Sequence, residues 1–411
     1  MKILTVVLNL DKGGTQRAAQ NFAEAYCLLD HDSRILSLYG LGSRYEEVKL
    51  KCKVYDGIGT INKIQDWDPD LIHIHSHGPK YEDVLLLIEK CKKAKIIETN
   101  VFSVPSPWAS FVDTSFQLSC WANWIFNLRG GSKYKSAIVP YPVKTESFAN
   151  IDKLECRELF CEKYDIDKSS KLLGRIGQAF DGKWSVGLIE VFNKLKKEDD
   201  SYHLVVVNPP KSVLLAIDYS PYKKSITVID KIIGDENLQL AYSAFDLTVV
   251  IVEQGESFGM VIPESILCGT PVVTLSTPWA DNSQLEVVGL DQKEFLCKNL
   301  KEVEISIVNY FNKPIHVRKE IQKIGVRHIK NSYDYIEVAK LALASDFEEV
   351  SFSGCKFNSI NKLLNYDFFT RFLIKLNSEN ARKLTIYTTG YKPLYLFPIQ
   401  AIRFLFRRIV K

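Results

Sequence analysis

The chain has 411 residues, enough for two or three domains at the usual size of roughly 100–200 residues each. Hydrophobic residues make up 46% of the sequence and charged residues 25%, which is typical of a globular protein and excludes a disordered one. The 53 Lys and Arg residues nearly balance the 49 Asp and Glu residues, for a net charge of +4. This balance excludes a protein whose affinity comes mainly from neutralising nucleic-acid phosphates.

The cysteines and the apolar segments indicate a cytoplasmic protein. The nine cysteines are an odd number without a Cys-x-x-Cys pair of the kind that zinc or redox sites use, so we expect reduced thiols. The apolar N-terminal stretch is too short for a signal peptide, and no window approaches the ~18 apolar residues of a membrane span. We therefore expect no membrane-crossing segment.

Short apolar runs rich in β-branched residues alternate with helical patterns, which predicts βαβ units and parallel sheets. The predicted strands are 3–8, 70–75, 95–98, 137–139, 172–176, 203–207, 225–229, 247–252 and 271–275. Between the two halves, Val139-Pro-Tyr-Pro-Val143 favours extended backbone and lacks two amide donors. We predict two α/β domains, 1–143 and 144–345, with a ligand-binding cleft between them and an extension over 346–411.

The end of the extension has the pattern of a basic amphipathic helix. Over 394–411, Arg403, Arg407 and Lys411 are four positions apart and share one face of a predicted helix, with apolar residues on the remainder. Such a helix suits an anionic membrane surface, although it could equally pack its apolar face on the protein.

Two segments in chain order are candidates for binding phosphate. Asp11-Lys-Gly13-Gly14-Thr-Gln-Arg17 follows the first strand and opens a helix, whose free amides attract an anion; a tight connection is the alternative. Arg175 ends the first strand of the second half and Lys183 follows it, so these two cations could hold a diphosphate, or be ordinary surface charges.

The strongest candidate is the segment from Glu256 to Glu264, which follows the predicted strand 247–252. Pro263 and Gly269 predict a short helix with Glu264 early on it, while Glu256 lies in the loop before it. Two carboxylates so placed could accept hydrogen bonds from one polyhydroxylated ligand, or merely favour the start of the helix.

Two further patterns suggest other chemistry. Gly255-Glu-Ser257-Phe-Gly259 matches the nucleophile elbow of serine hydrolases, with His316 and His328 downstream, but Pro263 falls where the elbow's helix should continue. The alternating histidines 73, 75 and 77 should point to one side of a strand, where they could bind zinc or lie as polar residues at a cleft.

Taken together, these motifs resemble the family-four retaining glycosyltransferases of the GT-B fold. The resemblance spans about residues 1 to 345 and rests on the Gly13-Gly14 loop, the strand histidines, Arg175 with Lys183, and Glu256 with Glu264. It implies two Rossmann-like domains, with the acceptor side at the N-terminus and a nucleotide-sugar donor domain after it. It also implies a donor linked to UDP, GDP or dTDP, without a cofactor or metal.

The resemblance also implies roles for individual residues. Arg175 and Lys183 would hold the diphosphate and, with Glu256 against the transferred sugar, form the catalytic set. Glu264 would bind the ribose, and backbone amides around Phe258, Gly259 and Met260 would contact sugar and phosphate, with Gly13 and Gly14 closing from the other domain. Asn100 stands where many members carry a donor-contacting histidine.

We therefore expect a cytoplasmic glycosyltransferase whose acceptor is a lipid-linked or cell-surface polysaccharide intermediate, peripheral on the inner membrane face through its C-terminal helix. The alternatives are a sugar-nucleotide epimerase of the same fold, a binding module without turnover, and, more remotely, a hydrolase using Ser257. The base, the sugar, the linkage and the oligomeric state are not specified by the sequence.

Overall fold

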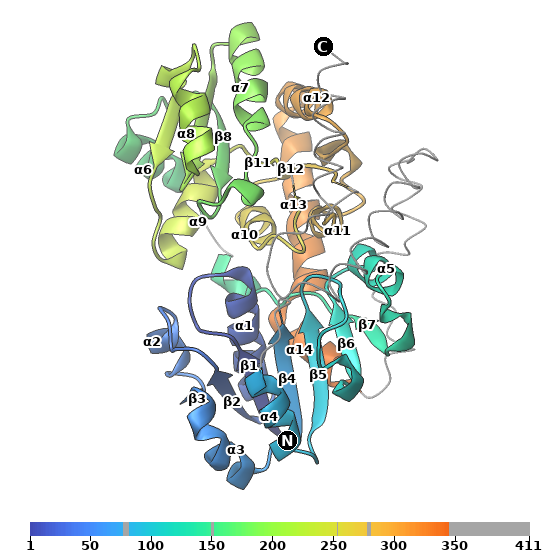
Figure 1. The fold of residues 1–411 in the computed structure, drawn as a ribbon. Helices are drawn as coiled ribbons and strands as arrows, with labels where there is room; N and C mark the ends of the chain where they lie inside the picture. Colours follow the sequence, from blue (N-terminus) through green and yellow to red (C-terminus); the bar gives the residue numbers. More distant parts are fainter. Residues whose placement is uncertain (77–81, 149–151, 253, 278–280, 345–411) are drawn as a thin grey trace. The chain divides into compact units, whose positions relative to one another are not determined.

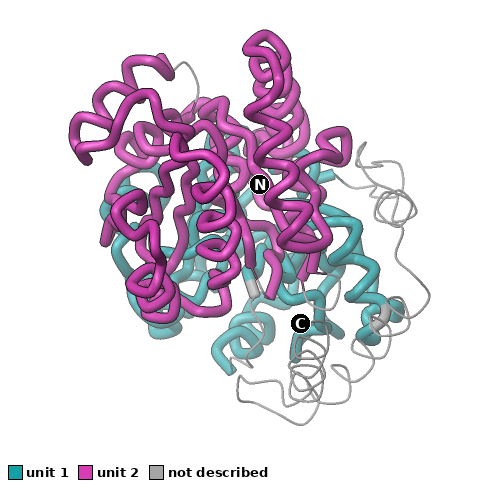
Figure 2. Tube along the Cα trace, turned by 90° about the horizontal axis from the view of Figure 1, so that it is seen from above, with its two compact units in different colours: residues 1–140, 339–351, 365–411 teal, residues 141–338, 352–364 magenta. Residues whose placement is uncertain are grey.

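The computed structural model describes residues 1–76, 82–148, 152–252, 254–277 and 281–344. These residues form two compact units (Figures 1 and 2). In the described part, unit 1 contains residues 1–140 and 339–344, and unit 2 contains residues 141–338. Within the described residues, the chain enters unit 2 once and returns to unit 1 once, and the sequence gives no sign of that return.

Unit 1 is built on a seven-stranded parallel sheet with the order β3-β2-β1-β4-β5-β6-β7. The strands are β1 (Lys2–Val7), β2 (Asp32–Ser37), β3 (Lys53–Asp56), β4 (Leu71–Ser76), β5 (Lys95–Asn100), β6 (Thr114–Gln117) and β7 (Ser136–Ile138). The helices between them are α1 (Gly14–Leu28), α2 (Tyr45–Val48), α3 (Ile61–Trp67), α4 (Glu82–Lys90) and α5 (Cys120–Leu128). Both faces of the sheet are buried, as the near-continuous apolar strands predict.

Unit 2 repeats this arrangement with a six-stranded parallel sheet of order β10-β9-β8-β11-β12-β13. Its strands are β8 (Lys171–Ile176), β9 (Tyr202–Val207), β10 (Ile226–Ile229), β11 (Leu247–Val250), β12 (Val272–Leu275) and β13 (Leu296–Cys297). Its helices are α6 (Lys153–Tyr164), α7 (Gly187–Glu198), α8 (Lys211–Asp218), α9 (Asp235–Ala244), α10 (Val261–Leu267), α11 (Gln284–Val288), α12 (Leu300–Asn312) and α13 (Ile315–Tyr333), and α14 (Tyr335–Leu343) leads back to unit 1.

Core packing explains the glycine in the first strand of unit 2. A Cβ on Gly174 would lie 2.0 Å from the ring of Phe245, so the aromatic side chain occupies the space that any larger residue would need. Phe245 in turn packs edge-on against Phe160 of α6. Gly174 is therefore explained by packing, and the functional interest of the Gly174-Arg175 pair lies in the arginine.

The first and last backbone segments of unit 2 are joined directly. The Val143 amide donates to the carbonyl of Tyr333 at 2.7 Å, and the Tyr335 amide donates to the carbonyl of Val143 at 3.0 Å. The hydroxyl of Thr145 adds a hydrogen bond to the Asp334 carboxylate at 2.6 Å. These bonds hold the entry and the exit of the unit side by side.

No helix within the described ranges is long and apolar enough to cross a membrane. The predicted basic helix over 394–411 and the rest of the predicted extension from residue 346 lie outside the described residues.

Candidate functional site

Arg175, Lys183 and Glu256, predicted to bind the donor, lie at or just after the ends of two neighbouring strands of unit 2. Arg175 is the second-last residue of β8 and Lys183 lies in the loop after it, while Glu256 lies in the loop after β11. β8 and β11 are adjacent and parallel, so these loops leave the same edge of the sheet. The carboxyl edge of a parallel sheet, where the strand order reverses, is where open α/β sheets bind ligands.

Arg175 is buried, with 1% of its surface exposed. Its two terminal nitrogens donate to the carbonyls of Ile176, at 2.7 Å, and Lys183, at 2.6 Å. The guanidinium also lies 5.0 Å from the ring centre of Trp184. Burial lowers the pKa of Arg175, and the nearby charge of Glu256 opposes that shift. A buried cation thus fixes the loop that carries Lys183.

Lys183 and Glu256 form an ion pair across the two loops. The Lys183 Nζ lies 2.5 Å from Glu256 Oε2, and the lysine side chain keeps 34% of its surface exposed against 8% for the glutamate. The loop that separates Lys183 from Arg175 folds back on itself, because the Trp184 indole nitrogen donates to the carbonyl of Gln178. The loop of seven residues between Arg175 and Lys183 thus has a path that brings Lys183 to Glu256.

The Glu256 loop is held in place by a second loop, which follows β12. The Gln284 side chain accepts from the Glu256 amide at 3.1 Å and donates to the Leu275 carbonyl and the Thr277 hydroxyl. Gly255 has a positive φ of 70°, and a Cβ there would lie 1.7 Å from the backbone oxygen of Asp281. This close approach requires glycine at position 255.

The residues after Glu256 lead into α10 as predicted. Phe258 is buried between Tyr141 and Tyr333, with ring centres at 5.4 Å and 5.3 Å. Gly259 has a φ of 80°, and a Cβ there would lie 3.1 Å from Glu256 Cγ. Met260 is the N-cap of α10. The loop therefore packs its own backbone against the Glu256 side chain.

Glu264 lies on the first turn of α10, where Pro263 and Gly269 predicted it. It is 4% exposed, and the Tyr242 hydroxyl, itself fully buried on α9, donates to its Oε2 at 3.4 Å. Gly269 has a φ of 72°, as expected for a residue that ends a helix.

The three remaining predicted residues belong to unit 1. Gly13 is the N-cap of α1 and Gly14 its first residue, so the predicted loop and helix start are present. Asn100 ends β5, and its amide nitrogen donates to the Val104 carbonyl at 2.7 Å. That bond fixes the loop after β5. The contacts of these three residues with a donor stay a prediction.

The strand histidines are core residues rather than cleft residues. His73 hydrogen-bonds to the Tyr26 hydroxyl at 2.9 Å and to the Thr99 hydroxyl at 2.8 Å, and it is completely buried. His75 packs 4.3 Å from the His73 ring, and its two nitrogens have no hydrogen-bond partner among the described residues. Burial lowers the pKa of His75 to about 3. His77 lies outside the described residues.

Neither the zinc site nor the serine-hydrolase elbow suggested by the sequence is supported by the described residues. In the described ranges, no group of three or more His, Cys, Asp or Glu side chains is placed to hold a metal ion. Ser257 does not open a helix directly, since α10 begins at Val261, and His328 is bonded to the Glu286 carbonyl at 3.1 Å. A hydrolase elbow requires the helix to follow its serine at once.

Sequence reasoning missed Gln284, Tyr242 and Trp184, which hold Glu256, Glu264 and the Lys183 loop respectively. A signal existed for Gln284, because it lies in the polar run Asp281-Asn-Ser-Gln284, which begins six residues after the end of the predicted strand 271–275. Tyr242 and Trp184 look like core aromatics in the sequence, and their polar atoms acquire a role only through the fold.

Comparison with known proteins agrees with this arrangement. Residues 157–306, which lie within unit 2, match the family model described as glycosyl transferases group 1. No curated protein sequence matches the chain. Among solved structures, a glycosyltransferase from Rickettsia africae ESF-5 is similar with a TM-score of 0.68 and 16% identity, over 85% of this chain and 99% of that one.

Two other solved structures are similar over comparable lengths. Anabaena Alr3699/HepE in complex with UDP and glucose has a TM-score of 0.66 and 15% identity, over 84% of this chain and 98% of its own. S. aureus TarM, solved with Fondaparinux, alpha-GlcNAc-glycerol and UDP, has a TM-score of 0.64 and 11% identity, over 84% and 99%. The expected GT-B fold is thereby confirmed, and residues 157–306 of unit 2 match the glycosyl transferases group 1 model; family four and the retaining mechanism stay predictions.

Proposed function

We propose that the protein is a retaining glycosyltransferase that moves a sugar from a nucleoside-diphosphate donor to a carbohydrate acceptor. The observation that carries the proposal is the Lys183–Glu256 ion pair above the buried Arg175, at the carboxyl edge of the unit 2 sheet. All three residues lie inside the segment that matches the glycosyltransferase family.

The charges of this cluster suit a diphosphate. Two cations and one carboxylate leave a net charge of +1 at the strand ends, and Lys183 is the member that is partly exposed. An incoming diphosphate would compete with Glu256 for the lysine ammonium. Arg175 would act through its charge and by holding the Lys183 loop, because both of its terminal nitrogens already donate to carbonyls. The cluster would thereby stabilise the leaving group as it departs.

The two carboxylates would bind hydroxyl groups. Glu264 would accept hydrogen bonds from the ribose, with Tyr242 fixing its orientation, while Glu256 would contact the transferred sugar next to the amides of Phe258, Gly259 and Met260. In a retaining transfer, the acceptor oxygen bonds to the anomeric carbon on the face from which the phosphate leaves. The departing phosphate oxygen would take the acceptor's proton, so the scheme needs no base from the chain.

The proposal also names a donor and an acceptor. UDP-glucose is the first donor to test, because the similar Anabaena protein is solved with UDP and glucose; GDP and dTDP sugars follow. Gly13, Gly14 and Asn100 would contribute from unit 1. The proposed acceptor is a lipid-linked or cell-surface polysaccharide intermediate, reached from the cytoplasmic face of the membrane. Its support is the basic sequence of 394–411.

The test is a thermal-shift panel of UDP-, GDP- and dTDP-sugars with EDTA present. A donor at ~100 times its dissociation constant should stabilise the wild type by about 2.7 kcal/mol. Glu264→Gln should lose most of that shift. Glu286→Gln, which alters another buried carboxylate of unit 2, should retain it. The proposal fails if no donor shifts the folded wild type, or if both variants respond alike.

Turnover then separates the transferase from the alternatives. A transferase releases nucleoside diphosphate and does so faster with acceptor present. An epimerase converts the donor sugar without an acceptor, and a binding module shifts the melting temperature without releasing any nucleoside diphosphate.

A further inference from the structure

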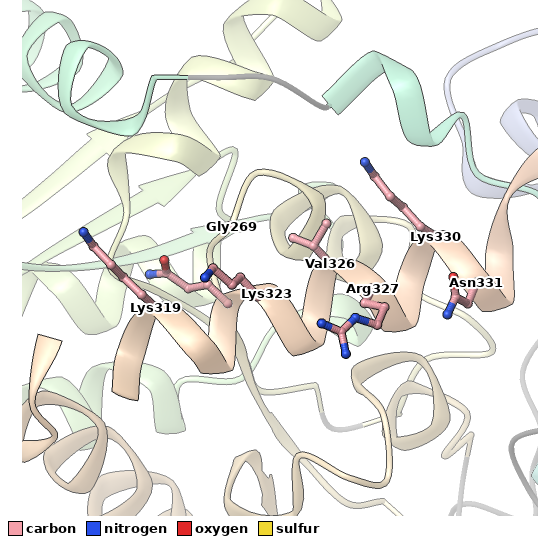
Figure 3. A pocket seen from close by; sticks show the side chains of 8 residues that line it. Gly269, Lys319, Lys323, Val326, Arg327, Lys330 and Asn331 are labelled. Carbon is pink, nitrogen blue, oxygen red and sulfur yellow. The ribbon is translucent and has the colours of Figure 1, made fainter. Parts of the chain in front are cut away.

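A pocket of about 540 Å³ lies along α13 in unit 2, apart from the donor residues (Figure 3). It is lined by Gly269, just past the C-terminal end of α10, and by seven residues of α13. The seven residues of α10 span about 10 Å, so the pocket lies beyond the far end of the helix from the loop that carries Glu256. It is therefore distinct from the site described above.

Helix α13 is rich in cations. α13 carries five Lys and Arg residues and one carboxylate, Glu320, so its net charge of +4 equals that of the entire chain. Lys323 lies 3.9 Å from Glu320, with 71% of its side chain exposed, which leaves its charge largely available to solvent. Such an exposed pair is weak.

Three of the lysines form a row. Lys319, Lys323 and Lys330 fall within about 40° around the helix axis, because they are separated by four and seven residues. The row is about 16 Å long at the helical rise per residue. Figure 3 shows Lys319 and Lys330 extending from the same side of α13. Gln322 and Asn331 also line the pocket. The positive charge is thus spread along the helix and is not confined to one point.

This lining favours one class of ligand. Pockets for small apolar ligands are lined mostly by hydrophobic side chains, whereas six of the eight residues that line this pocket are Lys, Arg, Gln or Asn. Its apolar wall therefore consists largely of alkyl stems that end in charged or amide groups. A row of about 16 Å exceeds what one phosphate group can contact. The amides of Gln322 and Asn331 can both donate to and accept from hydroxyl groups. A helix that inserts into a membrane surface would need several apolar residues on the same face, and the pocket contains only Val326.

We propose that this pocket binds an anionic carbohydrate polymer, one that carries carboxylate, sulfate or phosphate groups along its length. The idea that the pocket holds the acceptor between transfers rests on the proposed function. The binding of an anionic polymer to the pocket does not. A second binding site would retain a long acceptor chain by effective concentration between transfers.

The test compares two variants of the full chain that lose the same charge. One carries Lys319→Ala, Lys323→Ala and Lys330→Ala; the control carries Lys194→Ala, Lys197→Ala and Lys224→Ala, three exposed lysines elsewhere on unit 2. The probes are polygalacturonate, dextran sulfate and neutral dextran. We expect the α13 variant to bind the two polyanions about tenfold more weakly and the control less than about twofold more weakly, with no binding of neutral dextran and weaker binding at high salt.

Three results would overturn the proposal. The first is an equal loss in both variants, which would show a response to net charge alone. The second is absence of polyanion binding by a wild type that is folded. The third is binding to vesicles containing anionic phospholipid, but not to the polymers, that depends on the three α13 lysines. Donor-induced thermal shifts are measured in parallel: if no donor binds but the lysine dependence holds, the polymer site stands and the proposed transferase activity fails.

Discussion

The two units share a topology but differ in the charge of their buried polar residues. In each sheet the first strand lies between the second and the fourth. Among the described residues of unit 1, the buried charged side chains are both carboxylates, Glu24 and Glu98. In unit 2 the buried charged side chains include a cation at a strand end, Arg175, beside the carboxylate of Glu256. The fold therefore determines where polar side chains gather, and the residue types determine whether an anion can bind there.

The largest expected effect concerns two glycines with positive φ, one from each unit. Gly255→Ala should destabilise the protein by about 3 kcal/mol or more, because its Cβ would overlap the Asp281 backbone oxygen in addition to straining φ. Gly40→Ala in unit 1 should cost about 1 kcal/mol, since its φ is 112° but nothing lies within 4 Å. Denaturant unfolding measures both, and equal costs would contradict the close approach of the two loops.

The ion pair of unit 2 supplies the next test. Lys183→Met should weaken donor binding by about 2 kcal/mol, roughly thirtyfold, through loss of a charge-assisted contact to the diphosphate. Lys171→Met removes another paired lysine of unit 2, whose partner is Asp199, and should leave donor affinity unchanged. Titration calorimetry with the best donor gives both values. If the two variants bind alike, Lys183 has no contact with the ligand.

The buried histidines of unit 1 predict a dependence of stability on pH. Burial lowers the pKa of His75 to about 3, whereas in the unfolded chain it is about 6.5. Between these values the unfolded state takes up a proton that the folded state does not. The free energy of unfolding should therefore fall as the pH drops below about 6.5, by up to about 1.4 kcal/mol per pH unit for this histidine.

His75→Asn isolates that contribution. Between pH 7.5 and 5.5 the wild type should lose about 1 kcal/mol more stability than the variant does. The matched control is His316→Asn, an exposed histidine on α13. Urea unfolding at the two pH values measures the difference, and an identical pH response of wild type and His75→Asn would show that the imidazole is not buried in its neutral form.

The smallest expected effect is at Glu264. Tyr242→Phe removes one hydrogen bond, 3.4 Å long, and keeps the aromatic packing. Donor binding should weaken by about 0.5–1 kcal/mol, or two- to fivefold, since the carboxylate stays in place but loses its orienting partner. Tyr202→Phe on β9 is the control. An effect as large as that of Glu264→Gln would mean that the tyrosine itself binds the ligand.

Much of the fold follows from patterns in the sequence, and the missed strands show the limit. All nine predicted strands are present, because each is an apolar run long enough to stand out. The four strands that were not predicted lack a clear strand pattern: β2 begins with Asp32-Ser-Arg, β3 reads Lys-Val-Tyr-Asp, β6 reads Thr-Ser-Phe-Gln, and β13 has two residues. Their place in the sheets is fixed by neighbouring strands rather than by their own composition.

In the candidate site, too, features set by neighbouring residues could be predicted from the sequence, and features set by the fold could not. The position of Glu264 on α10 could be predicted, because Pro263 and Gly269 are local signals for a helix start and end. The pairing of Lys183 with Glu256 could not, since their residue numbers differ by 73 and a folded loop brings them together. The hydrogen bonds of Arg175 to two carbonyls likewise depend on the path of that loop.

The hydrogen-bonded ends of unit 2 should allow this unit to be exchanged between related proteins. Because Val143 is bonded to Tyr333 and Tyr335, the segment between them starts and finishes at one place. A module of this kind can be removed from its host, or inserted into another, without stretching either chain. Residues 141–338 should therefore be exchangeable as a cassette between proteins of this architecture.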